Sequence, residues 1–384
     1  MDQARLDASS SGDRRWLRPA LALKLRIAHV RPVGELLMSE SSAQAERLSR
    51  LHATPIWDTS HLSKTMGGPR ATGHVWRWDL LRPEFDEAIK TKLAGPGTER
   101  RIIGMLNPGL PPSYGAATHT LNGALQMILP GEIALAHRHT YAALRFILAG
   151  DGAYTVVNGV RADMHRHDLL LTPAMCWHSH THSGAEPMVW FDALDTPFVS
   201  YMRADAFELH PCRSLEPHNQ TAGGSDDFGN GGMLAGRERP RTANSPQLVY
   251  KWNVAESLIA RAFASDAIDP HEGAVFEYVN PHTGGHAMPT IACYAHGFPA
   301  GFHSLARRRT SSSLCVVAKG RGATIIDGHR FEWSERDVIA EPASAWCEYI
   351  AYEPSSLFRA SDQALLEPFG LLRVEDHPRG RQAI

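Results

Sequence analysis

The sequence has little net charge, few cysteines and no long uncharged apolar run, and each shortage excludes a class of protein. No stretch reaches the roughly 18 to 20 apolar residues that a membrane-spanning helix needs. The formal net charge of -2 gives no general electrostatic reason to bind nucleic acid or an anionic membrane. We therefore expect a protein that binds neither a nucleic acid nor a membrane.

The cysteines are dispersed, odd in number and free of any Cys-x-x-Cys pair: Cys176, Cys212, Cys293, Cys315 and Cys347. This pattern argues against a disulfide framework and against a thiolate zinc site. It is typical of a reducing compartment, so we expect a cytoplasmic protein.

The first 37 residues form a separate case, because they are rich in arginine and their apolar stretches are interrupted by charge. A secretory signal has an uninterrupted apolar core, which this segment lacks. We interpret residues 1–37 as a disordered extension or as the product of an upstream start codon, with Met38 as the alternative start. A targeting arm is the other interpretation.

Strand signals dominate after residue 120. Short runs rich in β-branched and apolar residues are broken by Gly, Pro and Asn-Gly, and Asn158-Gly159 suits the type I′ turn of a tight hairpin. Such short and regularly spaced strands predict a sandwich or a barrel.

An internal repeat shows how the chain is organised. GDGAYTVVNG (150–159) is echoed by GRGATIIDG (320–328), and HDLLLTPAMCW (167–177) by RDVIAEPASAW (336–346). We predict two tandem barrels, 120–212 and 247–384, joined by a linker or surface loop at 213–246 that is rich in Gly, Pro, Asn and Ser. Residues 38–119 would form an N-terminal region, partly helical, that packs on the barrels.

Histidines cluster in the first copy of the repeat. His137 and His139 are one residue apart, and on a strand such residues point to the same face, so both can reach one metal ion. A third ligand would come from a later strand, where His178, His180 and His182 alternate onto one side. The spacing alone does not choose among these three.

The second copy serves as a control for these histidines. Aligned on the repeat, Arg307 and Arg309 replace His137 and His139, and Cys347 replaces His178. Tyr349 likewise replaces His180. Because the fold does not need these histidines, we interpret them as chemical residues rather than as a buried pair bonded to the backbone.

Another His-x-His pair, His165 and His167, lies in a predicted turn, where it either binds a metal or is simply solvated. For the main cluster, three neutral imidazoles without a carboxylate or thiolate suit zinc, copper, nickel or iron(II). The residue types do not distinguish among these four metals.

Longer motifs narrow the choice. The pattern PG-x5-HxH with a later P-x4-H resembles the two motifs of the cupin barrels. RRIIGMLNPGL (100–110), HDLLLTPAMCWHSH (167–180) and WFDALDTP (190–197) resemble the gentisate 1,2-dioxygenase family of bicupins, which includes salicylate and 1-hydroxy-2-naphthoate dioxygenases. The resemblance implies an all-β fold of tandem cupin barrels, each a double-stranded β-helix.

The resemblance also implies roles for individual residues. The three iron(II) ligands fall on His137, His139 and His178, in the first cupin only, and the substrate-facing catalytic pair falls on Arg145 and His180. Further pocket positions match Gln126, Asp192 and Arg101, the last beside a second arginine, Arg100, that makes the match ambiguous.

The family's chemistry implies the reaction. A hydroxy-acid substrate chelates iron(II) through its carboxylate and ortho hydroxyl, and O2 reacts beside it. The ring then opens between the carboxyl-bearing and hydroxyl-bearing carbons, which turns gentisate into maleylpyruvate. The family forms symmetric homo-oligomers, often tetramers, and we expect the same here.

One departure leaves the substrate open. Asn122 stands where the family commonly carries an aromatic residue, and a smaller polar group there would admit a ring substituent or a larger ring. Substituted salicylates and 1-hydroxy-2-naphthoate are therefore alternatives to gentisate. Alternatives of other classes are a non-catalytic cupin that binds an aromatic acid and a metal-dependent isomerase or decarboxylase; oxygen consumption with a hydroxy acid would exclude them.

Overall fold

The computed structural model describes residues 44–53, 68–90, 101–218 and 244–384. It divides into two units, Met1–Gly68 and Pro69–Ile384. In the first unit, residues 44–50 are helical. The extension predicted at 1–37, and 219–243 of the predicted linker, lie outside the described residues. No helix in the described ranges is long and apolar enough to cross a membrane.

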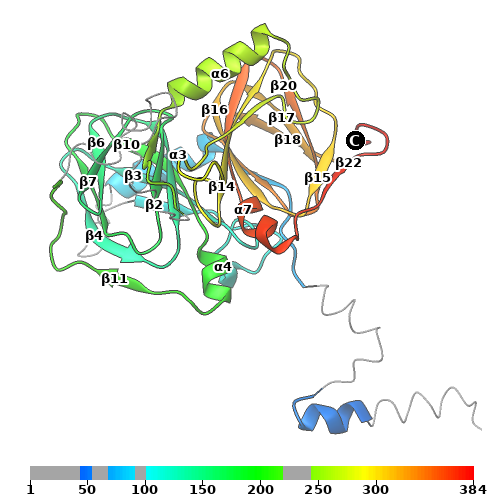
Figure 1. The fold of residues 1–384 in the computed structure, drawn as a ribbon, viewed down its shortest axis with the longest axis horizontal. Coiled ribbons are helices and arrows are strands. Elements are labelled where there is room, and N and C mark those ends of the chain that lie inside the picture. The colour runs from blue at the N-terminus through cyan, green and yellow to red at the C-terminus, as the bar shows by residue number, and fades with distance from the viewer. Residues whose placement is uncertain (1–43, 54–67, 91–100, 219–243) are drawn as a thin grey trace, which may run out of the picture. The chain divides into compact units, whose positions relative to one another are not determined.

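The described residues of the second unit form four β-sheets, two in each copy of the repeat (Figure 1). In the first copy, a sheet with strand order β12-β8-β5-β10-β3-β2 faces a sheet with order β11-β4-β9-β6-β7. The strands of the first of these sheets are β2 (Arg101–Gly104), β3 (Asn122–Ile128), β5 (Ala143–Ala149), β8 (Leu169–Thr172), β10 (Met188–Leu194) and β12 (Val249–Tyr250). Those of the second are β4 (Ile133–His139), β6 (Ala153–Val157), β7 (Val160–Met164), β9 (His178–His182) and β11 (Phe207–Leu209).

The second copy repeats this plan with orders β1-β19-β16-β21-β14-β13 and β18-β17-β20-β15-β22. Its first sheet has β1 (His74–Trp76), β13 (Ala274–Glu277), β14 (Ala292–Phe298), β16 (Ser313–Lys319), β19 (Val338–Glu341) and β21 (Ser355–Ser361). Its second has β15 (Arg307–Arg309), β17 (Arg321–Ile326), β18 (His329–Ser334), β20 (Trp346–Ala351) and β22 (Val374–Asp376). Short helices connect them: α3 (Trp78–Lys90), η1 (Pro112–Tyr114), α4 (Thr196–Tyr201), α6 (Trp252–Ala264), α7 (Gln363–Leu366) and η2 (Glu367–Phe369). The prediction of tandem all-β cupins with a partly helical N-terminal region is confirmed.

The turns follow the repeat. Asn158 and Gly159 have φ values of 46° and 83°, and Asp327 and Gly328 have 48° and 79°. Type I′ hairpin turns require positive φ at both central residues, so the turn predicted at Asn158-Gly159 forms and recurs in the second copy.

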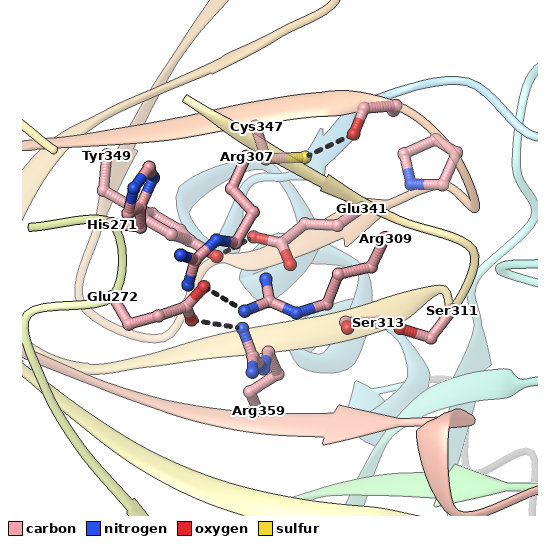
Figure 2. A pocket seen from close by; sticks show the side chains of 12 residues that line it. His271, Glu272, Arg307, Arg309, Ser311, Ser313, Glu341, Cys347, Tyr349 and Arg359 are labelled. Carbon is pink, nitrogen blue, oxygen red and sulfur yellow. Dashed lines mark hydrogen bonds and ion pairs between the residues drawn. The ribbon is translucent and has the colours of Figure 1, made fainter. Parts of the chain in front are cut away.

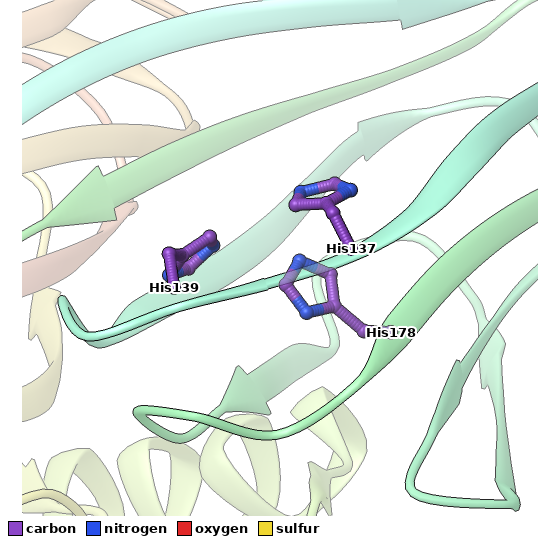
Figure 3. Close-up of side chains that lie close together, drawn as sticks. All are labelled: His137, His139 and His178. Carbon is purple, nitrogen blue, oxygen red and sulfur yellow. The ribbon is translucent and has the colours of Figure 1, made fainter. Parts of the chain in front are cut away.

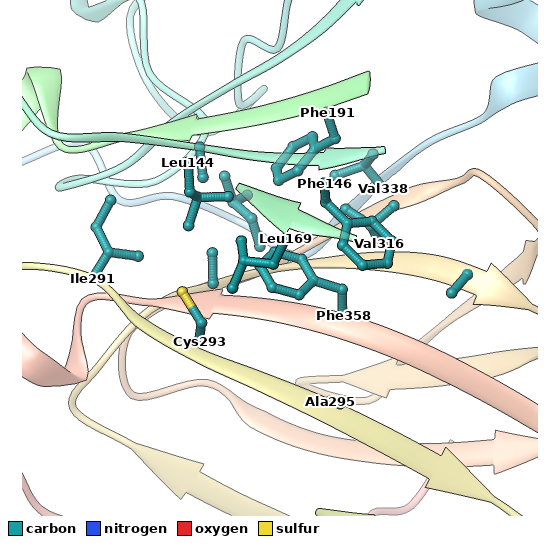
Figure 4. Packing of buried hydrophobic residues seen from close by; sticks show 14 of the residues in the cluster. Leu144, Phe146, Leu169, Phe191, Ile291, Cys293, Ala295, Val316, Val338 and Phe358 are labelled. Carbon is teal, nitrogen blue, oxygen red and sulfur yellow. The ribbon is translucent and has the colours of Figure 1, made fainter. Parts of the chain in front are cut away.

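A single apolar core joins the two barrels. It lies between the β5-containing sheet and the β16-containing sheet, as Figure 4 shows for Phe146, Phe191, Val316 and Phe358. The rings of Phe146 and Phe358 stack with their centroids 4.6 Å apart. Because alternate residues of a strand face opposite sides, the neighbours of Phe146 on β5 point into the first barrel. Strand β5 is therefore buried on both faces.

Strands cross between the barrels at two related places. β1, from the N-terminal region, pairs with β19 of the second barrel, whereas β12, which precedes the second barrel, pairs with β8 of the first. Helices α3 and α6 follow β1 and β12 at equivalent positions. This exchange ties each barrel to the segment that precedes the other.

Candidate metal centre

Three histidines converge inside the first barrel. His137 and His139 lie on β4, and His178 lies on the adjacent strand β9, where it pairs with His137 across the ladder. Their potential ligand atoms lie within 4.8 Å of one another, and all three side chains are buried (Figure 3). The three residues that the family resemblance assigns to iron thus lie together.

Hydrogen bonds orient each imidazole. The Nδ1 atoms of His137, His139 and His178 lie 2.6, 2.6 and 2.9 Å from the backbone carbonyl oxygens of Leu135, Tyr141 and Cys176. A carbonyl can only accept, so each Nδ1 carries the proton and Nε2 keeps its lone pair. Metal-bound histidines are commonly held in this way.

The environment also keeps His178 neutral. Burial lowers its pKa well below the usual 6.5, and the positive charge of Arg145 lowers it further. Among the described residues, its buried Nε2 has no hydrogen-bonding partner. A buried nitrogen lone pair beside two similar rings fits a divalent transition metal such as iron(II), for which imidazole is a suitable ligand.

Aromatic rings support two of the ligands. Tyr141 stacks on His139 with the ring centroids 3.9 Å apart, and Phe207 of β11 stacks on His137 at 5.1 Å. Neither aromatic residue was predicted from the sequence. Tyr141 directly follows the HRHT motif, so its position near His139 could have been inferred. Phe207 is brought next to His137 by the pairing of β11 with β4, which the sequence does not indicate.

A polar cluster centred on Asp192 lines the opposite sheet. Its carboxylate accepts hydrogen bonds from the Gln126 amide and, at 3.1 Å, from the Trp190 indole. The Nε of Arg145 lies 3.4 Å from Oδ1 of Asp192, and its Nη1 donates to the Thr172 hydroxyl. Arg145 is only 3% exposed. Arg145 therefore makes a buried ion pair, whereas arginines more commonly form salt bridges at the protein surface.

His180 lies next to the triad on β9. Its ring centroid is 5.8 Å from that of His178 and 5.7 Å from that of Trp190. Its Nδ1 lies 2.8 Å from the Thr155 hydroxyl of β6. Asn122 is on β3, four residues before Gln126 and hence on the same face of the strand.

Other predicted residues have separate partners. Arg101 is held by Glu132, with Nη1 2.8 and 3.0 Å from the two carboxylate oxygens, and no contact joins it to the Asp192 cluster among the described residues. His165 contacts Asp151, and His167 stacks on Phe146. The histidine pair of the turn is not part of any metal-ligand group in the described part of the chain.

The five cysteines are free, as predicted.

Residues 124–194, which include all three histidines, match the cupin domain family. Three enzymes of known function align with most of the chain. A 1-hydroxy-2-naphthoate 1,2-dioxygenase from Nocardioides is 34% identical and covers 82% of both chains. A 5-aminosalicylate 1,2-dioxygenase from Comamonas is 32% identical, covering 88% of this chain and 90% of the other. A Streptomyces gentisate 1,2-dioxygenase is 33% identical, covering 87% and 97%.

Solved structures agree with these relatives. The crystal structure of salicylate 1,2-dioxygenase from Pseudaminobacter salicylatoxidans superposes with a TM-score of 0.80 at 30% identity, covering 88% of this chain and 98% of that one. A gentisate adduct of the same enzyme also has a TM-score of 0.80, at 28% identity, with coverage of 92% and 96%. The chain therefore belongs to the gentisate 1,2-dioxygenase family and is a ring-cleaving dioxygenase of the gentisate and salicylate type.

Proposed function

We propose that this protein is an iron(II)-dependent dioxygenase that opens the ring of gentisate between the carboxyl-bearing and hydroxyl-bearing carbons and yields maleylpyruvate. The observation that carries the proposal is the convergence of three buried histidines, each held by a backbone carbonyl, beside a buried arginine. His137, His139 and His178 would hold the iron in the first cupin. When bound, iron(II) would supply electron transfer from the electron-rich ring to O2.

Arg145 would bind the substrate carboxylate. A buried guanidinium has five N–H donors in a planar fork that matches a carboxylate. Asp192 now balances its charge at 3.4 Å, a longer distance than a strong charge-assisted hydrogen bond. An incoming carboxylate would share the guanidinium with Asp192, while Gln126 and Trp190 keep Asp192 in place. The ring would thereby be fixed in one orientation.

His180 would move a proton at the substrate hydroxyl. Its partner, the Thr155 hydroxyl, can either donate to Nδ1 or accept from it, so the imidazole can carry its proton on either nitrogen. Such a ring can take the hydroxyl proton as the substrate binds and return it to the product. Arg101 would act indirectly, because it holds Glu132, the residue just before β4, rather than the substrate.

A second candidate function is the same ring cleavage on a substituted salicylate or on 1-hydroxy-2-naphthoate. The observation that favours it is Asn122, whose buried Oδ1 has no hydrogen-bonding partner among the described residues. An acceptor without a partner at this position would suit an amino substituent on the ring, because burial of an unsatisfied polar atom costs free energy.

The test is anaerobic loading with iron(II), followed by oxygen uptake and ultraviolet spectra with gentisate, 5-aminosalicylate, salicylate and 1-hydroxy-2-naphthoate. Gentisate should give the highest kcat/KM and a new ring-fission absorbance. A higher kcat/KM with another acid would replace gentisate with the second candidate. Full iron loading without oxygen uptake on any of these acids would contradict both and favour a protein that only binds them.

We also propose that the protein is cytoplasmic and forms a homotetramer. Sedimentation analysis would test the oligomeric state.

A further inference from the structure

Each histidine of the metal centre begins a short chain of hydrogen bonds. The Nδ1–H of the imidazole donates to a backbone carbonyl, and the N–H of that same peptide group donates onward to another acceptor. A peptide group is conjugated, and hydrogen bonds in a chain polarise one another, so the acceptor at the N–H changes the electron density on the carbonyl oxygen. The last group of each chain therefore acts on the imidazole.

Two of the three chains end at neutral groups. The acceptors are the backbone carbonyl of Arg213, 2.8 Å from the N atom of Ala136 in the chain from His137, and the side-chain oxygen of Asn158, 2.8 Å from the N atom of Trp177 in the chain from His178. These acceptors hold the peptide groups in place without adding a charge.

The chain from His139 ends at an acid instead. The peptide whose Tyr141 carbonyl accepts from His139 has its N–H on Ala142, and this N–H donates at 2.7 Å to Oδ1 of Asp195. Asp195 is only 4% exposed, and its Oδ2 accepts the hydroxyl of Thr290 at 2.5 Å. Burial raises the pKa of Asp195, and the hydrogen bonds from Thr290 and Ala142 oppose that rise. Both oxygens thus receive hydrogen bonds that favour the carboxylate form.

A carboxylate at the end of such a chain should strengthen the imidazole as a ligand. Charges act over longer distances in the protein interior than in water, because the interior screens them less. Groups that hold a ligating histidine from outside change metal affinity by roughly 10–100-fold when they are removed. The effect here would pass through one peptide group.

We propose that Asp195 is a positioning residue of the metal centre, which polarises the Tyr141–Ala142 peptide and makes His139 the strongest electron donor of the three ligands. Asp195 would act on the metal only through His139. Thr290, in the segment before β14 of the second barrel, would hold the carboxylate from its other side. This inference rests on the proposed iron site and adds to it a residue that tunes it.

The second barrel provides a matched control. Asp362 accepts the N–H of Ser312 at 2.7 Å and the hydroxyl of Thr120, as Asp195 accepts Ala142 and Thr290. Figure 2 shows the side chains that replace the three histidines in this barrel: Arg307, Arg309 and Cys347. Asp362 thus has the same structural contacts as Asp195, but the chain it ends begins at no histidine.

Anaerobic equilibrium dialysis of the metal-free full chain against iron(II) tests the proposal. Asp195→Asn keeps an oxygen acceptor but removes the charge, and it should raise the Kd for iron(II) about 10-fold. Asp362→Asn should leave this Kd unchanged. An unchanged Kd in Asp195→Asn, or an equal rise in both variants, would overturn this inference alone. Failure of the unaltered chain to bind iron(II) would overturn the proposed function as well.

Moving the charge to another histidine gives a second test. Asn158→Asp would place a carboxylate at the end of the chain from His178. The fold accepts an aspartate at this turn, because Asp327 of the second barrel has a φ of 48° against 46° for Asn158, and it accepts the Trp346 N–H at 2.8 Å. Added to Asp195→Asn, it should lower the raised Kd at least ~3-fold. No recovery would show that the charge is not what matters and would overturn the proposal.

The midpoint potential of the bound iron is a readout that a purely structural role would not shift in a set direction. Asp195→Asn should raise the potential and Asn158→Asp should lower it, because a nearby negative charge stabilises the more highly charged oxidation state. Asp362→Asn should leave the potential unchanged. Shifts of the same sign in the first two variants, or no shift in either, would contradict the proposal.

Discussion

The carboxylate of Asp168 in the first barrel accepts the backbone N–H of Trp252, 3.0 Å away at the start of α6. Asp337 of the second barrel accepts the N–H of Trp78, 2.7 Å away at the start of α3. These two aspartates are the repeated residues of HDLLLTPAMCW and RDVIAEPASAW. Each barrel therefore anchors the helix that precedes the other barrel in the chain.

Removal of one anchor should destabilise the protein without affecting its chemistry. Asp168→Ala would remove the acceptor for Trp252 and the partner of Lys251, whose Nζ lies 2.7 Å away. We expect a loss of ~1–2 kcal/mol in unfolding free energy, as for other lost helix caps. Thermal unfolding should show it, with Asp151→Ala as an exposed control. Normal unfolding of Asp168→Ala would mean that the helix is held by packing alone.

His139→Ala should remove most of the bound iron and nearly all turnover, because two imidazoles hold a divalent metal much more weakly than three. Metal analysis and oxygen uptake measure both effects. His165→Ala is the matched control, since this exposed histidine contacts only Asp151 in the described structure. Normal iron content in the His139 variant would refute its assignment as a ligand.

Arg145→Ala should keep the iron and lose at least ~30-fold in kcat/KM, since a buried charged contact to a substrate contributes about 2 kcal/mol or more. The loss should appear in kcat/KM for every carboxylate-bearing substrate. Arg161→Ala changes an exposed arginine that pairs with Asp163 and should have no effect. An unchanged kcat/KM in Arg145→Ala would place the substrate carboxylate elsewhere.

Asn122→Phe should narrow the pocket for large rings. Relative to gentisate, kcat/KM for 1-hydroxy-2-naphthoate should fall ~10-fold, since steric exclusion of part of a ring costs 1–3 kcal/mol. Steady-state kinetics with both acids measure the ratio, and Asn122→Ala, which opens the same space, should not lower it. A ratio that is unaffected by the larger side chain would show that residue 122 does not face the ring.

Acid should weaken the fold through His167. Burial, with Arg166 and Arg336 nearby, lowers its pKa from 6.5 to about 4. The unfolded chain thus takes up a proton more readily than the folded one, and the stability that this histidine contributes is present above pH 6.5 and lost as the pH falls towards 4. His167→Asn, which tolerates the positive φ of 68°, should flatten this loss. Urea unfolding at several pH values from 7 to 4 gives the free energy of unfolding of the variant and of the unaltered protein. If His167 were not responsible, this free energy would fall equally steeply with pH in both.

The repeat and the histidine spacing made the main features predictable, because both depend on local patterns. A turn such as Asn158-Gly159 and a pair such as His137 and His139 require only neighbouring residues. The polar cluster around Asp192 was predictable only by resemblance. Its contacts depend on the register of β10 against β3 and β5, which brings together residues far apart in the sequence. Thr172 and Thr155 were missed for the same reason.

The burial of β5 on both faces makes the packing of the first barrel depend on the second. Arg145 pairs with Asp192 inside the first barrel, while its neighbour Phe146 stacks on Phe358 of the second barrel. A shorter descendant that lost the second barrel would expose the apolar side of this sheet and release the strand that carries the arginine. The second barrel thus covers the apolar face of the sheet that carries Arg145, and substitutions in this barrel can shift β5 without any contact to the residues of the metal centre.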